Sequence, residues 1–87
     1  MFWIYVLKSD ADGACYIGST KDIEKRLRRH NQGEYRYTKG HRPWKLIYKE
    51  VANSRSEVIK RERYLKSGVG RKELKDLVFN HTLCPVV

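Results

Sequence analysis

The sequence has no long hydrophobic run, and this absence excludes a bilayer-spanning helix. Its longest uncharged apolar stretch, residues 1–7, is far shorter than the roughly 20 apolar residues that cross a membrane. No basic segment precedes the stretch and no small-residue cleavage site follows it, so we do not expect a signal peptide. Internal repeats, low-complexity tracts and linkers are also absent. The sequence therefore predicts one small domain, residues 1–87, without membrane contact.

Cysteine is scarce, and its scarcity excludes a disulfide framework. The two cysteines, Cys15 and Cys84, lie far apart, and neither belongs to a Cys-x-x-Cys pair. The three histidines show no ligand spacing with either cysteine, which disfavours structural zinc. These features predict a reduced, intracellular protein, with a Cys15–Cys84 disulfide as the less favoured alternative.

Acidic residues are also few, and the resulting charge predicts a polyanionic partner. Lys plus Arg number 19 against 10 for Asp plus Glu, which gives a formal net charge of +9. A field of this sign attracts polyanions, of which nucleic acid is the commonest. Six tyrosines, two tryptophans and two phenylalanines argue against disorder, because aromatic residues are typical of chains that pack a core.

Residues 2–18 predict a β-hairpin. Two runs rich in aromatic and β-branched residues flank a turn-forming segment of Ser, Asp, Ala and Gly. Because side chains alternate along a strand, Tyr5 and Leu7 should share one face, and Ile4 and Val6 the other.

The rest of the chain predicts three helices and one more strand. We expect a helix over 22–31, begun by Thr20 or Asp22 and stopped by Gly33, and then a basic loop over 33–45. A strand should follow over 45–52. The next helix should run from the Ser54–Glu57 capping box to about residue 67, and the last helix over 71–80, after a break at 68–70. The order ββ-α-β-α-α predicts the α+β class. We expect a small three-stranded antiparallel sheet, made of the N-terminal hairpin and the later strand and flanked by helices.

Arg26 and His30 are the first residues that an ordinary domain does not explain. Helical spacing places both beside the apolar stripe of the first predicted helix, one turn apart. A functional arginine at this position would face a cleft. An isolated arginine can instead lie flat along the edge of a core with its guanidinium in water, and both interpretations stay open here.

Glu62 is the second anomaly, because it falls inside the apolar stripe of the next predicted helix. A carboxylate directed at a sheet is costly unless it is paired, hydrated or bound to a metal. Lys66 follows at i,i+4, in the order that favours an ion pair. Glu62 is therefore either the partner of Lys66 or a ligand for a divalent cation.

The segment 33–45 interleaves aromatic with basic side chains. This composition suits nucleic acid, because basic groups hold phosphates and rings stack on nucleobases. A solvated loop anchored by Trp44 explains it equally well. The residues that we expect to bind nucleic acid are Lys21, Arg29, Arg36, Thr38, Lys39, Arg42 and Lys66.

Together these residues resemble the GIY-YIG nuclease superfamily. Tyr16-Ile17-Gly18 stands intact, and Trp3-Ile4-Tyr5 carries Trp where the family name has Gly; the two tyrosines are 11 residues apart. Arg26 matches the first-helix arginine of the family, and His30 a histidine that many members carry one turn later. Glu62 matches the metal-binding glutamate.

Three short segments point to one branch of the superfamily. Residues 30–33, 42–44 and 66–68 are similar to the stand-alone, single-domain bacterial branch, whose relatives include the amino-terminal nuclease domain of the excision-repair incision subunit. The family often has a late asparagine, for which Asn80 is a candidate. We expect no appended DNA-binding domain, which leaves target selection unexplained and makes a targeting protein a candidate partner.

The resemblance implies a metal-dependent DNA endonuclease that acts in repair or recombination, in the bacterial cytoplasm at the nucleoid. A single Mg²⁺ or Mn²⁺ would bind Glu62. Tyr5 would be the base, with its phenolate favoured by Arg26; Tyr16 would support it, and His30 would share the proton or hold the phosphate. The small frame favours recognition of branched or single-stranded DNA over a long specific sequence.

Two other functions fit the charge. The first is a non-catalytic module that binds DNA or RNA, and RNA is also an alternative substrate for the nuclease. The second is an interaction domain for an acidic protein. Neither requires a carboxylate on an inner helix face or a hairpin with two tyrosines, which is why the nuclease is the favoured interpretation.

Overall fold

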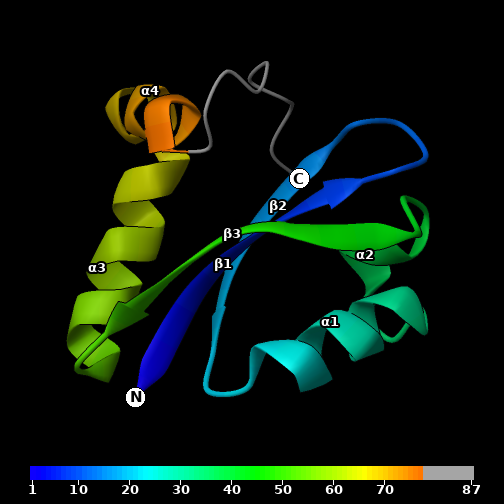
Figure 1. The fold of residues 1–87 in the computed structure, drawn as a ribbon, viewed down its shortest axis with the longest axis horizontal. Coiled ribbons are helices and arrows are strands. Elements are labelled where there is room, and N and C mark those ends of the chain that lie inside the picture. Colours follow the sequence, from blue (N-terminus) through cyan, green and yellow to red (C-terminus); the bar gives the residue numbers. More distant parts are fainter. Residues whose placement is uncertain (78–87) are drawn as a thin grey trace.

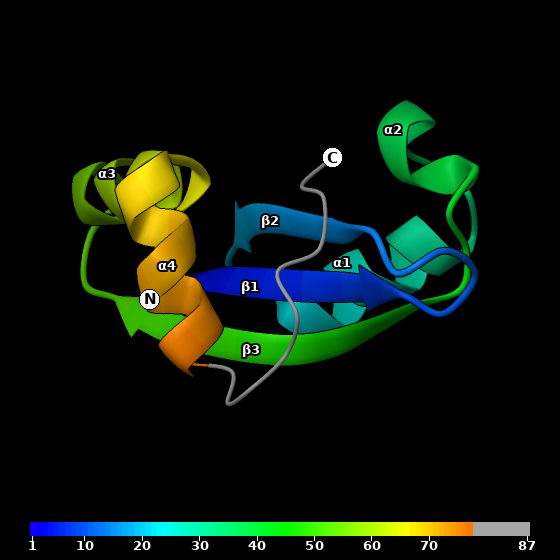
Figure 2. The same ribbon diagram turned by 90° about the horizontal axis from the view of Figure 1, so that it is seen from above.

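Strand β1 (Phe2–Ser9) is the middle strand of a three-stranded antiparallel sheet. The computed structural model describes residues 1–77. β2 (Cys15–Thr20) pairs with one edge of β1 and β3 (Trp44–Ala52) with the other, which gives the order β2-β1-β3 (Figure 1 and Figure 2). The predicted α+β class and the order of its main elements are confirmed.

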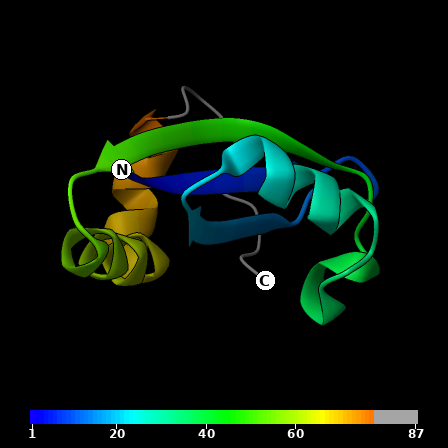
Figure 3. The same cartoon turned by 90° about the horizontal axis from the view of Figure 1, so that it is seen from below.

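Helices cover both faces of this sheet. The first face carries α1 (Ile23–Asn31), which lies in front of the sheet in Figure 3 and behind it in Figure 2. The opposite face carries α3 (Arg55–Lys66) and α4 (Gly68–Leu77). Within residues 1–77, no helix is both long and apolar enough to cross a membrane.

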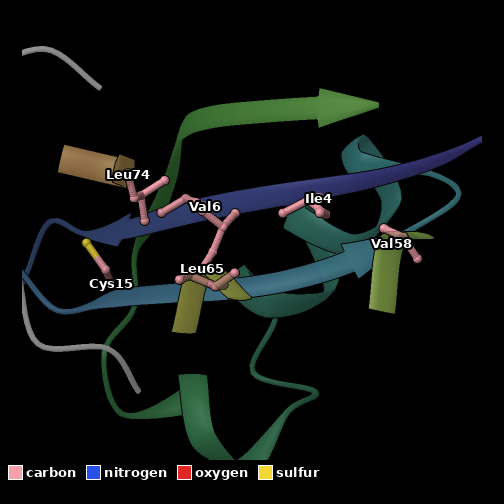
Figure 4. Close-up of a cluster of buried hydrophobic side chains, with 7 residues drawn as sticks. Ile4, Val6, Cys15, Val58, Leu65 and Leu74 are labelled. Atoms are coloured by element: carbon pink, nitrogen blue, oxygen red, sulfur yellow. The ribbon is translucent and has the colours of Figure 1, made fainter. Parts of the chain in front are cut away.

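The alternating side chains of β1 build two separate cores. Ile4 and Val6 are buried against Val58 and Leu65 of α3, together with side chains of β2 and α4 (Figure 4). On the other face the buried cluster contains Tyr5, Leu7, Ala14 and Trp44, and Leu27 of α1 packs against it. The predicted division of the strand into two faces is confirmed, and burial of these apolar side chains stabilises both layers.

The predicted helix boundaries follow from their caps. Asp22 begins α1, and its side chain accepts a hydrogen bond from the Lys25 amide at 3.1 Å. Gly33, just after the helix, has a φ of +81°, the left-handed conformation that favours glycine. Ser54 accepts from the Glu57 amide at 3.1 Å, and the Glu57 carboxylate accepts from the amide of the preceding Asn53.

Two expectations about the helices were wrong. The segment 33–45 is not wholly a loop, because it contains the short helix α2 (Arg36–Lys39). The last helix begins at Gly68 rather than at 71, because the Ser67 hydroxyl accepts from the Gly70 amide at 3.2 Å and so caps a new helix where α3 ends. Gly70 does not interrupt the helix, although the sequence had suggested that it would. A Cβ there would lie 1.9 Å from the Tyr64 carbonyl oxygen, so glycine allows α4 to approach α3.

Cys15 also differs from expectation. It is buried in the core between the sheet and α3, and it is disulfide-bonded rather than reduced. A count of two cysteines fixes neither the redox state nor a pairing, so the sequence could not decide this point. Cys84 and Asn80 lie outside the described residues.

Candidate active site

Tyr5 lies over Gly18 of the neighbouring strand, which is its partner in the β1–β2 register. A Cβ atom at residue 18 would lie 2.5 Å from the Tyr5 hydroxyl oxygen and 2.7 Å from Cζ. Only glycine leaves room for the ring in this position. Tyr16, on the same strand as Gly18, places its ring 6.2 Å from that of Tyr5. Both Tyr16 and Gly18 of the Tyr16-Ile17-Gly18 motif thus help to set the position of Tyr5.

The last turn of α1 brings His30 to Tyr5. His30 is 1% exposed, and its Nε2 atom lies 3.0 Å from the Tyr5 hydroxyl oxygen. Its ring also lies 4.9 Å from the ring of Tyr16. The structure therefore brings together three of the predicted site residues in one buried cluster.

The unpredicted helix α2 supplies the second partner of His30. The Thr38 hydroxyl lies 2.7 Å from His30 Nδ1, and Thr38 is fully buried. The Trp44 indole donates to the Thr38 carbonyl at 2.9 Å, which holds α2 against the start of β3. The expectation that Thr38 contacts nucleic acid was wrong, because its side chain is turned inward onto His30.

Arg26 lies at the mouth of this cluster, half-buried. Its guanidinium carbon is 5.4 Å from the ring centre of Tyr35, a cation–π contact. The Tyr35 ring in turn lies 4.5 Å from His30. Sequence reasoning missed Tyr35 as a site residue, although its place between Gly33 and the basic residues of α2 was a signal that it packs near the end of α1.

Burial controls the protonation of Tyr5 and His30. It raises the pKa of Tyr5 well above the usual value, and the charge of Arg26 lowers it only in part. Arg26 favours the Tyr5 phenolate as expected, but burial outweighs it, so Tyr5 carries its proton at neutral pH. Burial, followed by the charge of Arg26, lowers the pKa of His30 to about 4, so its imidazole is neutral.

Glu62 forms the ion pair that was one of the two interpretations left open by the sequence. Its carboxylate accepts from the Lys66 ammonium at 3.0 Å, the expected i,i+4 pair. Its negative charge is also the smallest of the causes that raise the pKa of Tyr5, although Glu62 belongs to α3 on the other face. The side chain is 25% exposed.

The other predicted nucleic-acid contacts fall into two groups. Lys21 and Arg29 line a groove of about 410 Å³ together with Arg26. A second group is exposed on α2 and the loop after it; its members are Arg36, Lys39 and Arg42. Lys66, on α3, belongs to neither group and pairs with Glu62.

Glu62 fits a divalent cation that keeps most of its water. No group of three or more His, Cys, Asp or Glu side chains gathers among the described residues, which argues against an all-protein cage there. Mg²⁺ commonly binds through one or two carboxylates plus water and substrate phosphate. Glu62, which is partly exposed, can serve as such a carboxylate.

Comparison with known proteins decides the family. The model of the GIY-YIG catalytic domain matches residues 1–75, and thus nearly all of the described part of the chain. This chain belongs to the GIY-YIG family. Membership places it among nucleases that act on nucleic acid and generally use a divalent metal.

Several relatives share the GIY-YIG fold and much of the sequence. A UPF0213 protein of Staphylococcus saprophyticus is 45% identical over 74 residues, which are 84% of this chain and 89% of the relative. A UPF0213 protein of Staphylococcus aureus is 38% identical over the same coverage. The solution NMR structure of a UPF0213 protein from Bacillus halodurans matches 88% of this chain and 85% of its own, with 30% identity and a TM-score of 0.54.

Proposed function

We propose that this chain is a metal-dependent endonuclease that hydrolyses phosphodiester bonds in DNA. The observation that supports it most is the buried Tyr5–His30 hydrogen bond beside Arg26, with the charge of Glu62 acting on the same hydroxyl. A proton-carrying pair, a phosphate-binding cation and a metal-binding carboxylate are the parts that hydrolysis needs. Simple binding of nucleic acid needs only the cation.

The phosphate and the metal are assigned to different elements. Arg26 of α1 presents a planar guanidinium fork to the scissile phosphate, whose charge increases in the transition state. Glu62 of α3 would hold one Mg²⁺ or Mn²⁺, which neutralises phosphate charge and makes a bound water more acidic. Lys66, 3.0 Å from the Glu62 carboxylate, orients that side chain.

The hydrogen bonds around His30 define a path for the proton of the attacking water. We assign the His30 proton to Nδ1, which then donates to the Thr38 hydroxyl, while that hydroxyl faces the Tyr35 carbonyl oxygen at 3.4 Å. Nε2 is then free to accept from Tyr5. The water passes its proton to the Tyr5 oxygen as Tyr5 passes its own to Nε2. The new P–O bond forms as the bond to the leaving oxygen breaks, and the leaving oxygen takes up a proton from solvent water. His30 then releases the proton that it accepted. Tyr16 bonds the phosphate or the water.

Binding of substrate makes His30 a better proton acceptor in this scheme. The charge of Arg26 is one cause of the low pKa of His30. A phosphate paired with Arg26 cancels that charge, so the pKa of His30 rises when the scissile bond is in place. Tyr5 therefore never has to exist as a free phenolate, which its burial opposes.

Substrate and cellular role follow from size and charge. The chain has a net charge of +9 and no room in residues 1–77 for a long reading surface, so we propose recognition of branched or single-stranded DNA. Arg36, Lys39 and Arg42 would bind phosphates away from the cut. Such an enzyme would serve DNA repair or recombination in the bacterial cytoplasm, and a targeting protein would direct it.

A cleavage assay on labelled duplex, single-stranded, flap and fork DNA, with structured RNA alongside, tests the proposal. With Mg²⁺ or Mn²⁺ we expect cuts that disappear in EDTA. Arg26→Ala and Glu62→Gln should keep the fold, judged by circular dichroism, and lose activity by about a hundredfold or more.

Matched controls are available in α1. Arg28→Ala and Glu24→Gln remove the same charges at exposed positions outside the cluster and should cut at close to the wild-type rate. Shifted but uncut bands for wild type on every substrate would instead support the non-catalytic binding module. Wild-type rates in folded Arg26 and Glu62 variants would overturn the site.

A further inference from the structure

A groove lies between the beginning of α1 and the beginning of α3, outside the cluster around Tyr5. Its lining comes from the end of β2 and the two residues after it, from the first two turns of both helices, and from Phe2. The volume of about 410 Å³ is near the lower end of pockets that hold one small molecule, roughly 300–1,000 Å³. A single nucleotide fits such a space, whereas a base-paired duplex does not.

The charge of the groove is strongly positive. Five cationic side chains line it: Lys21, Lys25, Arg26, Arg29 and Arg55. Within the described residues none of the five forms an ion pair. The carboxylate of the single acidic lining residue already accepts the Lys25 amide as the cap of α1. Five cations against this one carboxylate leave the groove with a net positive charge that suits a phosphate.

The groove also has an apolar wall. Val58 and Ile59 of α3 line one side, and Ile59 is 44% exposed although it is aliphatic. The half-buried ring of Phe2 lies at the same site, with the exposed Lys21 ammonium 5.2 Å from its centre. A flexible lysine can leave this ring for a phosphate, which opens an aromatic face. Aromatic faces joined to cations are how proteins hold unpaired bases.

Arg26 connects the groove to the proposed active site. It lines the groove, and it also contacts Tyr35 and acts on the pKa values of Tyr5 and His30. A ligand in the groove is therefore the immediate neighbour of a phosphate held by Arg26.

We propose that this groove binds one unpaired nucleotide next to the cleaved bond, with the base on Phe2 and Ile59 and its phosphate on Arg29 and Arg55. The inference rests on the proposed nuclease function and deepens it. It makes the substrate a nucleic acid with an unpaired nucleotide at the cut, such as a flap or a single-strand junction, rather than a continuous duplex.

Binding measured without catalysis tests the groove separately from the reaction. In EDTA, fluorescence anisotropy would compare two duplexes of equal length and charge, one of them carrying a single unpaired 2-aminopurine nucleotide at a junction. Wild type should bind the junction about tenfold more tightly or better, and the 2-aminopurine emission should be quenched as its base stacks. Equal affinity for the two duplexes would overturn the inference.

Matched variants locate the effect. Arg29→Ala and Arg55→Ala should reduce the preference for the junction to about one and remove the quenching. Arg28→Ala on α1 and Arg63→Ala on α3 make the same change outside the groove; they should weaken both duplexes alike and keep the preference. An unchanged preference in the two groove variants would overturn the site.

The two proposals fail in distinguishable ways. A retained preference in EDTA without cleavage in Mg²⁺ supports the groove and counts against the nuclease. Cleavage at equal rates on paired and unpaired substrates supports the nuclease and overturns the groove.

Discussion

The Nδ1 atom of His30 lies 2.7 Å from the hydroxyl oxygen of Thr38, and both side chains are buried. This contact joins the end of α1 to α2 behind the Tyr5–His30 hydrogen bond. Since a neutral imidazole carries its proton on one nitrogen at a time, the partner of Nδ1 decides what Nε2 offers to Tyr5. Thr38 is thus a positioning residue in the proposed reaction.

Removal of the Thr38 hydroxyl should disturb the tautomer of His30. Thr38→Val keeps the shape and leaves Nδ1 without a partner, at a cost of about 1–2 kcal/mol in the free energy of unfolding. We expect kcat to fall by about tenfold, less than the 10²–10⁴-fold cost of losing an acid–base group itself, with KM unchanged. Nitrogen-15 shifts of the His30 ring should show the proton moving from Nδ1 toward Nε2. Thr38→Ser should restore both readouts; a Val variant with wild-type shifts and rate would refute this role.

Acid should destabilise the fold through His30. The folded pKa is about 4 against an ordinary 6.5, so the unfolded chain binds more protons between these values. Stability is therefore complete above pH 6.5 and falls as pH drops toward 4, by an amount on the order of 3 kcal/mol. Urea unfolding at pH 7, 6 and 5 measures the slope. His30→Gln should flatten it, and the same slope in that variant would show that another group is responsible.

Arg26 should control the pKa of His30. Its positive charge disfavours the imidazolium, so Arg26→Gln is expected to raise the pKa of His30 from about 4 toward the ordinary value. A histidine NMR titration measures this directly. Arg28→Gln, an exposed change on the same helix, should leave the midpoint in place. A rise of equal size in both variants would point to net charge rather than to the contact.

Gly18→Ala should displace Tyr5. The new Cβ would lie 2.5 Å from the Tyr5 hydroxyl oxygen, so the ring must move away from His30. Overpacking of this kind costs about 1–3 kcal/mol, and activity should fall with it. Gly40→Ala is the matched control, because a Cβ there meets nothing within 4 Å and Gly40 has a φ of −78°. Thermal unfolding of the two variants compares the costs, and equal midpoints would contradict the close approach.

The fold was predictable where local chemistry and periodicity agree. Alternation along β1, the Asp22 and Ser54 caps and the Gly33 stop each carry a short-range signal, and each is confirmed. Helix α2 was missed because it has only four residues and no side-chain cap at Tyr35. It is held instead by the Trp44–Thr38 hydrogen bond and by the contact of Thr38 with the buried His30, both of which depend on how the layers pack.

For the candidate site, the sequence proposed residues but not the contacts among them. Spacing and resemblance selected Tyr5, Tyr16, Arg26, His30 and Glu62. The inward turn of Thr38 and the raised pKa of Tyr5 depend on burial, which is a property of the assembled layers. Sequence weighs the charge of Arg26 but not the water that packing removes, and the removal of water is the larger effect here.

Strand β1 contributes side chains to both cores of the protein. Because its side chains alternate between the aliphatic core under α3 and the cluster under α1, a shift in pairing by one residue would exchange Tyr5 with Val6. Such a chain would bury a hydroxyl among aliphatic groups and present an isopropyl group to His30, losing stability and chemistry at once. Selection for a stable sheet and selection for a working site therefore act on the same strand register, and a change that harms one also harms the other.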